Sequence, residues 1–109
     1  MFINKTLTAR MAGGKHLSFR LYDKNTAFKD VPALYVFLDD QNHALYIGQT
    51  TELGTRLANH HKWYEASQKG FSVIGVCMDV PRSLLEEVER ELIQTYRPVC
   101  NDILYSDMS

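Results

Sequence analysis

Glu89 lies on the apolar side of a predicted helix, where a carboxylate is costly. The apolar residues of this helix recur at helical spacing and, at about 100° per residue, span roughly half a turn; they are Leu84, Leu85, Val88, Leu92, Ile93 and Tyr96. The other glutamates of the segment fall outside this arc, whereas Glu89 projects within it near one rim. A buried carboxylate needs a compensating partner. Glu89 could therefore face a cleft and bind a cation or a basic side chain, or it could lie at the rim and reach solvent.

A guanidinium and an imidazole come together on the preceding predicted helix. Apolar residues at helical spacing predict a helix over residues 53–64, and Arg56 and His60 are four positions apart on it. Such a pair shares a helix face, here beside the apolar stripe. Lys62 and Trp63 follow in a basic and aromatic stretch that could stack on bases or grip phosphates. The same stretch could equally be an ordinary helix end and loop.

Two tyrosines lie on neighbouring strands of a predicted hairpin. Residues 34–38 and 44–48 are apolar and rich in strand-forming types, and a turn cluster of sequence DDQNH separates them. A short hairpin can bring the hydroxyls of Tyr35 and Tyr46 onto one side of the sheet. Strand tyrosines most often only pack against their neighbours. Chemistry is favoured here because these tyrosines, the arginine and histidine pair, and the glutamate arise on adjacent elements.

The elements that must position these side chains alternate along the chain. Strands are predicted at 16–22, 34–38, 44–48 and 71–80, and helices at 53–64 and from Ser83 onward. Ser83 and Glu86 have the spacing of a capping box, and Pro98 ends the helix. This order predicts an α+β fold with a small central antiparallel or mixed β-sheet flanked by helices.

Composition bounds the class of protein. A chain of 109 residues with 45% hydrophobic and 23% charged residues fits one folded domain. Two cysteines are too few for a disulfide scaffold or a four-ligand zinc site, so we expect reduced, half-buried thiols. No apolar run is long enough to cross a bilayer or resembles a secretion signal. We therefore expect an unprocessed cytoplasmic protein that does not bind membranes.

The net charge of -1 hides an uneven distribution. Residues 1–30 carry six basic and two acidic side chains, whereas residues 31–80 and 81–109 are both net acidic. The basic surplus could simply keep an edge soluble, or it could face phosphates. For a nucleic-acid-binding protein, the overall balance predicts weak affinity without help and strong sensitivity to salt.

The order and spacing of these residues resemble the GIY-YIG nuclease superfamily over about residues 31–103. Pro32-Ala33-Leu34-Tyr35 and Leu45-Tyr46-Ile47-Gly48 resemble its two tyrosine motifs, and Arg56, His60 and the glutamate helix follow at matching distances. The Leu-Ile pair after the glutamate selects Glu89 over its neighbours. The resemblance is nearest to the N-terminal nuclease domain of the bacterial excision-repair incision subunit. Two positions depart from the pattern: Ala33 replaces a glycine, and Gln49 stands where the repair subunits commonly carry a lysine.

The resemblance implies a divalent-metal-dependent endonuclease that hydrolyses phosphodiester bonds in DNA. In that interpretation Glu89 binds Mg²⁺ or Mn²⁺ and Arg56 grips a phosphate oxygen. Tyr35 is the general base with His60 as its relay, and Tyr46 orients the water or the phosphate, although the two tyrosines could exchange roles. Four further residues are assigned to the neighbourhood of the substrate: Gly48, Lys62, Trp63 and Asn101. Of these, Asn101 is better placed to fix the loop beside the site.

The resemblance also divides the chain and suggests its partners. Residues 1–30 form a basic extension of strand and loop, and residues 31–109 form the nuclease-like domain. The expected partner is DNA, with RNA not excluded, and a homodimer or a larger DNA-binding partner is possible. The pathway could be DNA repair or a mobile element. A non-catalytic nucleic-acid-binding or interaction module on the same fold is the alternative, and a purely structural α+β domain is a further one.

Overall fold

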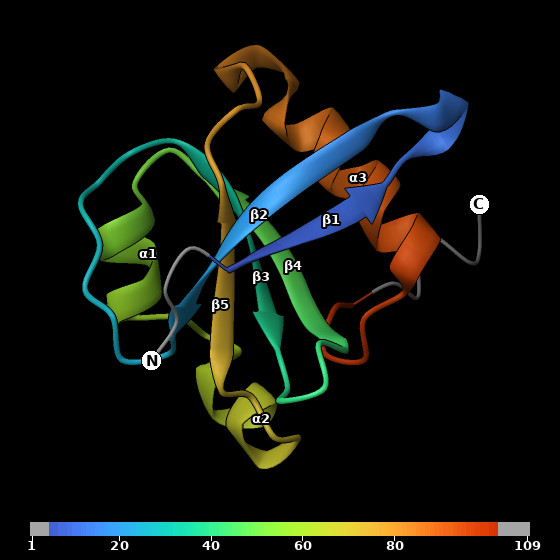
Figure 1. Ribbon diagram of the computed structural model, residues 1–109. Helices are drawn as coiled ribbons and strands as arrows, with labels where there is room; N and C mark the ends of the chain where they lie inside the picture. The colour runs from blue at the N-terminus through green and yellow to red at the C-terminus, as the bar shows by residue number, and fades with distance from the viewer. Residues whose placement is uncertain (1–4, 103–109) are drawn as a thin grey trace.

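The computed structural model describes residues 5–102, which form one five-stranded sheet with helices on both faces (Figure 1). The strands lie in the order β1-β2-β5-β3-β4, and every neighbouring pair is antiparallel. Their bounds are β1 Thr6–Arg10, β2 His16–Asp23, β3 Ala33–Leu38, β4 Ala44–Thr50 and β5 Val73–Cys77. The predicted α+β architecture is confirmed. Residues 1–4 of the predicted extension and 103–109 of the predicted nuclease-like domain lie outside the described range.

The helices divide between the two faces of the sheet. They are α1 Leu53–Ala58, α2 Trp63–Gln68 and α3 Leu85–Tyr96, with short 3₁₀ turns η1 Ala12–Gly14 and η2 Arg82–Leu84. Leu53 and Leu57 of α1 pack with Tyr35 on one face, whereas Leu85 and Leu92 of α3 pack on the other. Figure 1 shows α1 and α3 on opposite sides of the sheet. No helix among the described residues is long and apolar enough to span a bilayer.

Strand β3 is the centre of the core because helices cover both of its faces. All six of its residues are buried, as expected for a strand with no solvent-facing side. Phe37 stacks on Phe71 with ring centroids 4.2 Å apart, and Trp63 meets both rings edge-on. This aromatic cluster holds the first turn of α2 against the sheet.

The N-terminal segment contributes two strands to the same sheet. β1 pairs with β2, and β2 pairs with β5 in a register that sets Arg20 opposite Val76. The β1–β2 hairpin also lies across α3, where the Tyr96 hydroxyl accepts a 2.8 Å hydrogen bond from the Arg10 amide. Tyr96 is 43% exposed and Leu84 is 42% exposed, so the buried face of α3 is narrower than the predicted apolar arc.

The predicted helix over residues 53–64 is interrupted. α1 ends at Ala58, Asn59 has φ -135° and ψ 44°, and α2 begins only at Trp63. Asparagine favours such breaks because its side chain competes for backbone hydrogen bonds. The prediction that Arg56 and His60 share one helix face is therefore wrong, and a turn after α1 places His60. Leu53 and Leu57 are buried as predicted, but Tyr64 is 74% exposed.

Two boundary predictions also differ from the structure. Ser83 lies inside η2 and α3 begins at Leu85 with no side-chain cap, so the predicted capping box does not form. Strand β5 covers Val73–Cys77 and is therefore shorter at both ends than the predicted 71–80. Pro98 follows the end of α3 as predicted, after Arg97 adopts a left-handed conformation with φ 46°. Both cysteines are buried free thiols.

A strap just before β3 fixes the start of α1. The Asp30 carboxylate accepts hydrogen bonds from the Thr55 amide at 2.6 Å and the Thr55 hydroxyl at 2.8 Å. The neighbouring carbonyls of Lys29 and Val31 accept from the Gly54 and Leu53 amides. Asp30 thus acts as the N-terminal cap of α1 from 25 residues away.

Gly54 allows this strap to lie against the helix. A Cβ built at Gly54 would stand 2.2 Å from the Phe28 carbonyl oxygen, a separation that no side chain tolerates. The strap therefore lies close against the start of α1 because Gly54 has no side chain, and the Asp30 carboxylate holds it there.

We expect Asp30→Ala to lower the thermal unfolding midpoint by several degrees at pH 7, because the first turn of α1 loses its cap. Hydrogen bonds from Thr55 hold the pKa of Asp30 below its usual value. The stabilisation is therefore present above about pH 3.9, the pKa of an unfolded aspartate, and is lost as pH falls through the folded pKa. Calorimetry of both proteins between pH 2 and 7 measures this. A difference in midpoint that is unchanged at pH 2 would contradict it.

Candidate active site

Tyr35 and Tyr46 lie on one face of the sheet near its β4 edge. The register pairs Tyr35 of β3 with Gly48 of β4, and Phe37 with Tyr46, so the two tyrosines are diagonal neighbours. Their ring centroids are 6.1 Å apart. Tyr35 has no exposed surface and Tyr46 is 9% exposed. The hairpin therefore brings both tyrosines to one place, as the sequence predicts.

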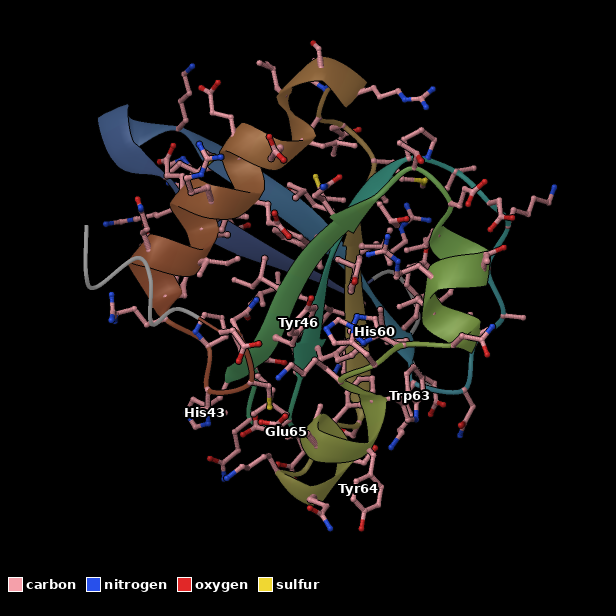
Figure 2. The ribbon with its side chains drawn as sticks, turned by 180° about the vertical axis from the view of Figure 1, so that it is seen from behind. His43, Tyr46, His60, Trp63, Tyr64 and Glu65 are labelled. Carbon is pink, nitrogen blue, oxygen red and sulfur yellow. The ribbon has the colours of Figure 1, made fainter. Side chains whose placement is uncertain are left out.

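His60 completes this group from the turn after α1. Its Nε2 lies 2.7 Å from the Tyr35 hydroxyl, and its ring centroid is 4.8 Å from that of Tyr46. Figure 2 shows Tyr46 and His60 beside each other at the centre of this face. Only 7% of His60 is exposed.

The hydrogen bonds of His60 identify its tautomer. The Lys62 amide donates to Nδ1 at 3.0 Å, so that nitrogen carries no proton. Burial, together with the nearby His61, Arg56 and Lys62, lowers the pKa of His60 to about 4. The ring is therefore neutral near pH 7 and has its proton on Nε2. It follows that His60 donates to the Tyr35 oxygen.

Both tyrosine hydroxyls are harder to ionise than a free phenol. Burial is the main cause that raises the pKa of Tyr35, and a hydrogen bond and the charge from Arg56 oppose it. Burial and the Glu89 charge raise the pKa of Tyr46, whereas a hydrogen bond from Tyr35 lowers it. Both groups are therefore protonated at neutral pH in the free protein.

Arg56 faces the tyrosines from α1 and remains exposed to solvent. Its position depends on the first turn of α1, which the strap of residues 29–31 fixes. Although the exposed guanidinium hydrogen-bonds to Tyr35, it has further donors for an anion such as a phosphate, for which its planar fork is well suited.

Glu89 approaches the same place from α3. It is half-buried, and burial together with Glu86 raises its pKa, whereas the Gln49 amide and the Arg56 charge oppose that rise. The hydrogen bond from the Gln49 backbone amide places the carboxylate at the β4 edge, three residues along the strand from Tyr46. The predicted position of Glu89 on the inner side of the helix agrees with the structure.

A single carboxylate at Glu89 fits Mg²⁺ better than it fits a metal ion that needs three or four protein ligands. Among residues 5–102 no group of three or more His, Cys, Asp or Glu side chains could hold a metal ion. Mg²⁺ tolerates a single carboxylate because it keeps most of its waters and takes phosphate oxygens. Glu89, with one backbone donor on its carboxylate, retains lone pairs for such an ion.

The four residues assigned to the neighbourhood of the substrate have well-defined contacts within the protein. Gly48 leaves room for the Tyr35 ring, since a Cβ there would lie 2.5 Å from the Tyr35 hydroxyl oxygen. The Asn101 amide accepts from the Ile47 amide and donates to the Ile47 carbonyl, both at 2.9 Å. Asn101 therefore fixes the outer edge of β4 next to Tyr46.

Lys62 and Trp63, which the sequence suggested as contacts for a substrate, both contact other side chains of the protein. Lys62 Nζ lies 3.2 Å from a Glu65 carboxylate oxygen and 3.6 Å from one of Asp102. Trp63 packs edge-on against Phe37 and Phe71. Both side chains thus have structural contacts in addition to any that a substrate would make.

Sequence reasoning missed three residues that shape the site. His61 stacks on His60 with ring centroids 5.0 Å apart and meets the Tyr46 ring edge-on at 6.0 Å. Asp30 and Gly54 fix α1 and hence Arg56. The adjacent pair of histidines was a visible signal for His61. No local pattern identifies Asp30, because its partner lies 25 residues away.

Known proteins resemble this chain in sequence and in fold. A family model described as the GIY-YIG catalytic domain matches residues 31–102. The crystal structure of the GIY-YIG N-terminal endonuclease domain of UvrC from Thermotoga maritima, bound to magnesium as its catalytic divalent cation, is 23% identical with a TM-score of 0.58. The alignment covers 68% of this chain and 86% of that one.

A second structure of the same Thermotoga maritima domain, a tyrosine-to-phenylalanine mutant bound to its catalytic divalent cation, is 22% identical with the same TM-score and coverage. These likenesses show the fold. A search of curated protein sequences finds no match. With the family match extending over most of the described residues, the chain belongs to the GIY-YIG family.

Proposed function

We propose that the chain is a divalent-metal-dependent endonuclease that hydrolyses phosphodiester bonds in DNA. The observation that carries this proposal is the convergence of a half-buried Glu89, an exposed Arg56 and two buried tyrosine hydroxyls at one edge of the sheet. Membership of the GIY-YIG family supports it. The proposed site contains Tyr35, Tyr46, Arg56, His60 and Glu89.

Arg56 would hold the phosphate directly, and Glu89 would hold it through a divalent cation. Glu89 holds Mg²⁺ or Mn²⁺ through its carboxylate, with waters and phosphate oxygens completing the coordination. When bound, the cation stabilises the negative charge that grows on the phosphate and the leaving oxygen. Arg56 holds a non-bridging oxygen and orients the phosphorus toward the tyrosines.

The direction of the hydrogen bonds supports one of the two tyrosines as the general base. His60 donates from Nε2 to the Tyr35 oxygen, which leaves the Tyr35 hydroxyl proton for Tyr46, and a hydrogen bond from Tyr35 lowers the pKa of Tyr46. A Tyr46 phenolate at the end of this chain is stabilised by both donors and by the charges of Arg56 and Lys62. We therefore assign proton acceptance from the attacking water to Tyr46. Tyr35 and His60 stabilise the negative charge of the Tyr46 phenolate before it takes the proton, and the hydroxide that forms attacks the phosphorus. This assignment exchanges the tyrosine roles expected from the sequence.

Glu89→Gln should lower cleavage by about a hundredfold or more, because the amide cannot hold the cation. Supercoiled plasmid, single-stranded DNA and branched DNA are incubated with each protein and Mg²⁺ or Mn²⁺. Glu87→Gln, on the exposed side of the same helix, is the matched control and should cleave like wild type. Calorimetric titration of Mn²⁺ measures whether metal binding disappears with Glu89.

Equal cleavage by wild type and Glu89→Gln would identify a contaminant or a different site. DNA binding by the wild type without any cleavage, and without metal binding at Glu89, would favour the alternative of a non-catalytic nucleic-acid-binding module on the same fold.

The rate of cleavage should rise with pH between about 6 and 9. The pKa of Tyr46 is raised above its ordinary value of about 10, so its ionised fraction grows about tenfold per pH unit in this range. A base with the pKa of His60, about 4, would give a rate that is already flat above about pH 6.

Tyr46→Phe and Tyr35→Phe separate the two tyrosines in the same assay. Tyr46→Phe removes the general base and should lower the cleavage rate about a hundredfold or more, whereas Tyr35→Phe should lower it less. A pH-independent rate, or a Tyr35→Phe variant that is the more damaged of the two, would contradict the assignment.

A further inference from the structure

His60 also lines a cavity that the other four proposed catalytic residues do not reach. The cavity has a volume of about 530 Å³, within the range of pockets that bind small organic ligands. The loop of residues 24–28, the end of α1 and Trp63 form its other walls. Figure 2 shows Trp63 near the lower end of α1, close to His60.

The walls of the cavity combine flat aromatic rings with amide groups. Trp63 and Phe28 supply the rings, and Trp63 is held in place by its edge contacts with Phe37 and Phe71. The exposed residues Asn25 and Asn59 line the same space. A planar ligand with hydrogen-bonding edges matches these groups.

The charge of the cavity favours an uncharged planar group over a bare anion. Lys24 is the one cation among the described lining residues, and no carboxylate lines the cavity. Its ammonium group lies 3.0 Å from the Ser67 hydroxyl and stands over the rings of Phe71 and Trp63. Since Lys24 is already engaged in this wall, it does not make the cavity a phosphate site.

The position of the cavity relates it to the phosphate site. Arg56 lies on α1, and Leu57, Ala58 and Asn59 continue from it into the cavity wall. The helical residues Leu57 and Ala58 add about 3 Å of rise beyond Arg56, and Asn59 follows directly. A phosphate on Arg56 and a base in the cavity could therefore belong to neighbouring parts of one strand.

We propose that this cavity binds one unpaired nucleobase of the DNA strand, next to the phosphate held by Arg56. The proposal rests on the proposed function and adds the substrate class: DNA with unpaired nucleotides, such as single strands, bulges and flaps. A base inside a duplex cannot enter the cavity without leaving its stack, which is costly. Trp63 stacks on the base, and the amides of Asn25 and Asn59 bond to its edge.

Fluorescence of Trp63 tests the proposal directly, because it is the only tryptophan of the chain. The protein is titrated in EDTA, where no cleavage occurs, with a short single-stranded oligonucleotide. An oligonucleotide of the same length made only of abasic sites, and a fully paired duplex, are the comparison ligands. We expect saturable quenching by the single strand and at least about tenfold weaker quenching by both others.

The double substitution Asn25→Ala and Asn59→Ala should weaken binding of the single strand about tenfold. Both side chains are exposed, and because Asn59 also ends α1, circular dichroism and the NMR signals of the His60 ring check that the fold and this turn persist. Gln94→Ala, on the exposed side of α3, is the control and should bind like wild type. Equal quenching by the abasic strand, or unchanged binding by the folded double variant, would overturn the proposal.

The Glu89→Gln variant separates this inference from the proposed function. If the variant and the wild type both show base-dependent quenching while neither cleaves DNA, the base site stands and the nuclease assignment fails. If the wild type cleaves paired and unpaired DNA equally well and Trp63 reports no base, the nuclease stands and the base site is overturned.

Discussion

The hydrogen bond between the buried Tyr35 hydroxyl and His60 Nε2 sets the chemistry of the whole site. At 2.7 Å and away from solvent, it joins the sheet to the turn after α1. Because the Lys62 amide occupies Nδ1, the direction of this bond is fixed, and the neutral imidazole is a donor. A buried donor that cannot leave its acceptor polarises the Tyr35 hydroxyl and makes it a stronger donor toward Tyr46, which lies at the open end of the pair.

The rest of the fold holds this interaction in place. Asn59 breaks the helix so that the chain can turn His60 inward, and the aromatic cluster around Phe37 fixes α2 behind it. The strap at Asp30 sets α1 and the Arg56 guanidinium, while Asn101 fixes the edge of β4 beside Tyr46. Each partner of the site is thus held by a contact from a distant part of the chain, which lets a small domain build a rigid centre.

Sequence patterns predicted what depends on local periodicity. Alternating strands and a turn cluster placed Tyr35 and Tyr46 on one face, and the helical arc singled out Glu89. The same reasoning failed over residues 53–64. The spacing of apolar residues there predicts one continuous helix, but α1 ends before Asn59 and the chain then turns to bury His60. The cap by Asp30 and the side-chain-free contact at Gly54 depend on segments that meet only after folding, so no local pattern contains them.

The central claim is that His60 is neutral and donates its Nε2 proton to Tyr35. Nitrogen NMR of the His60 ring, by long-range proton correlations from pH 8 down to about pH 3, measures the tautomer and the pKa together. The structure predicts a ring protonated on Nε2 and unprotonated on Nδ1 throughout the neutral range, with a transition only near pH 4. A proton on Nδ1, or titration near the ordinary histidine pKa of about 6.5, would contradict the account.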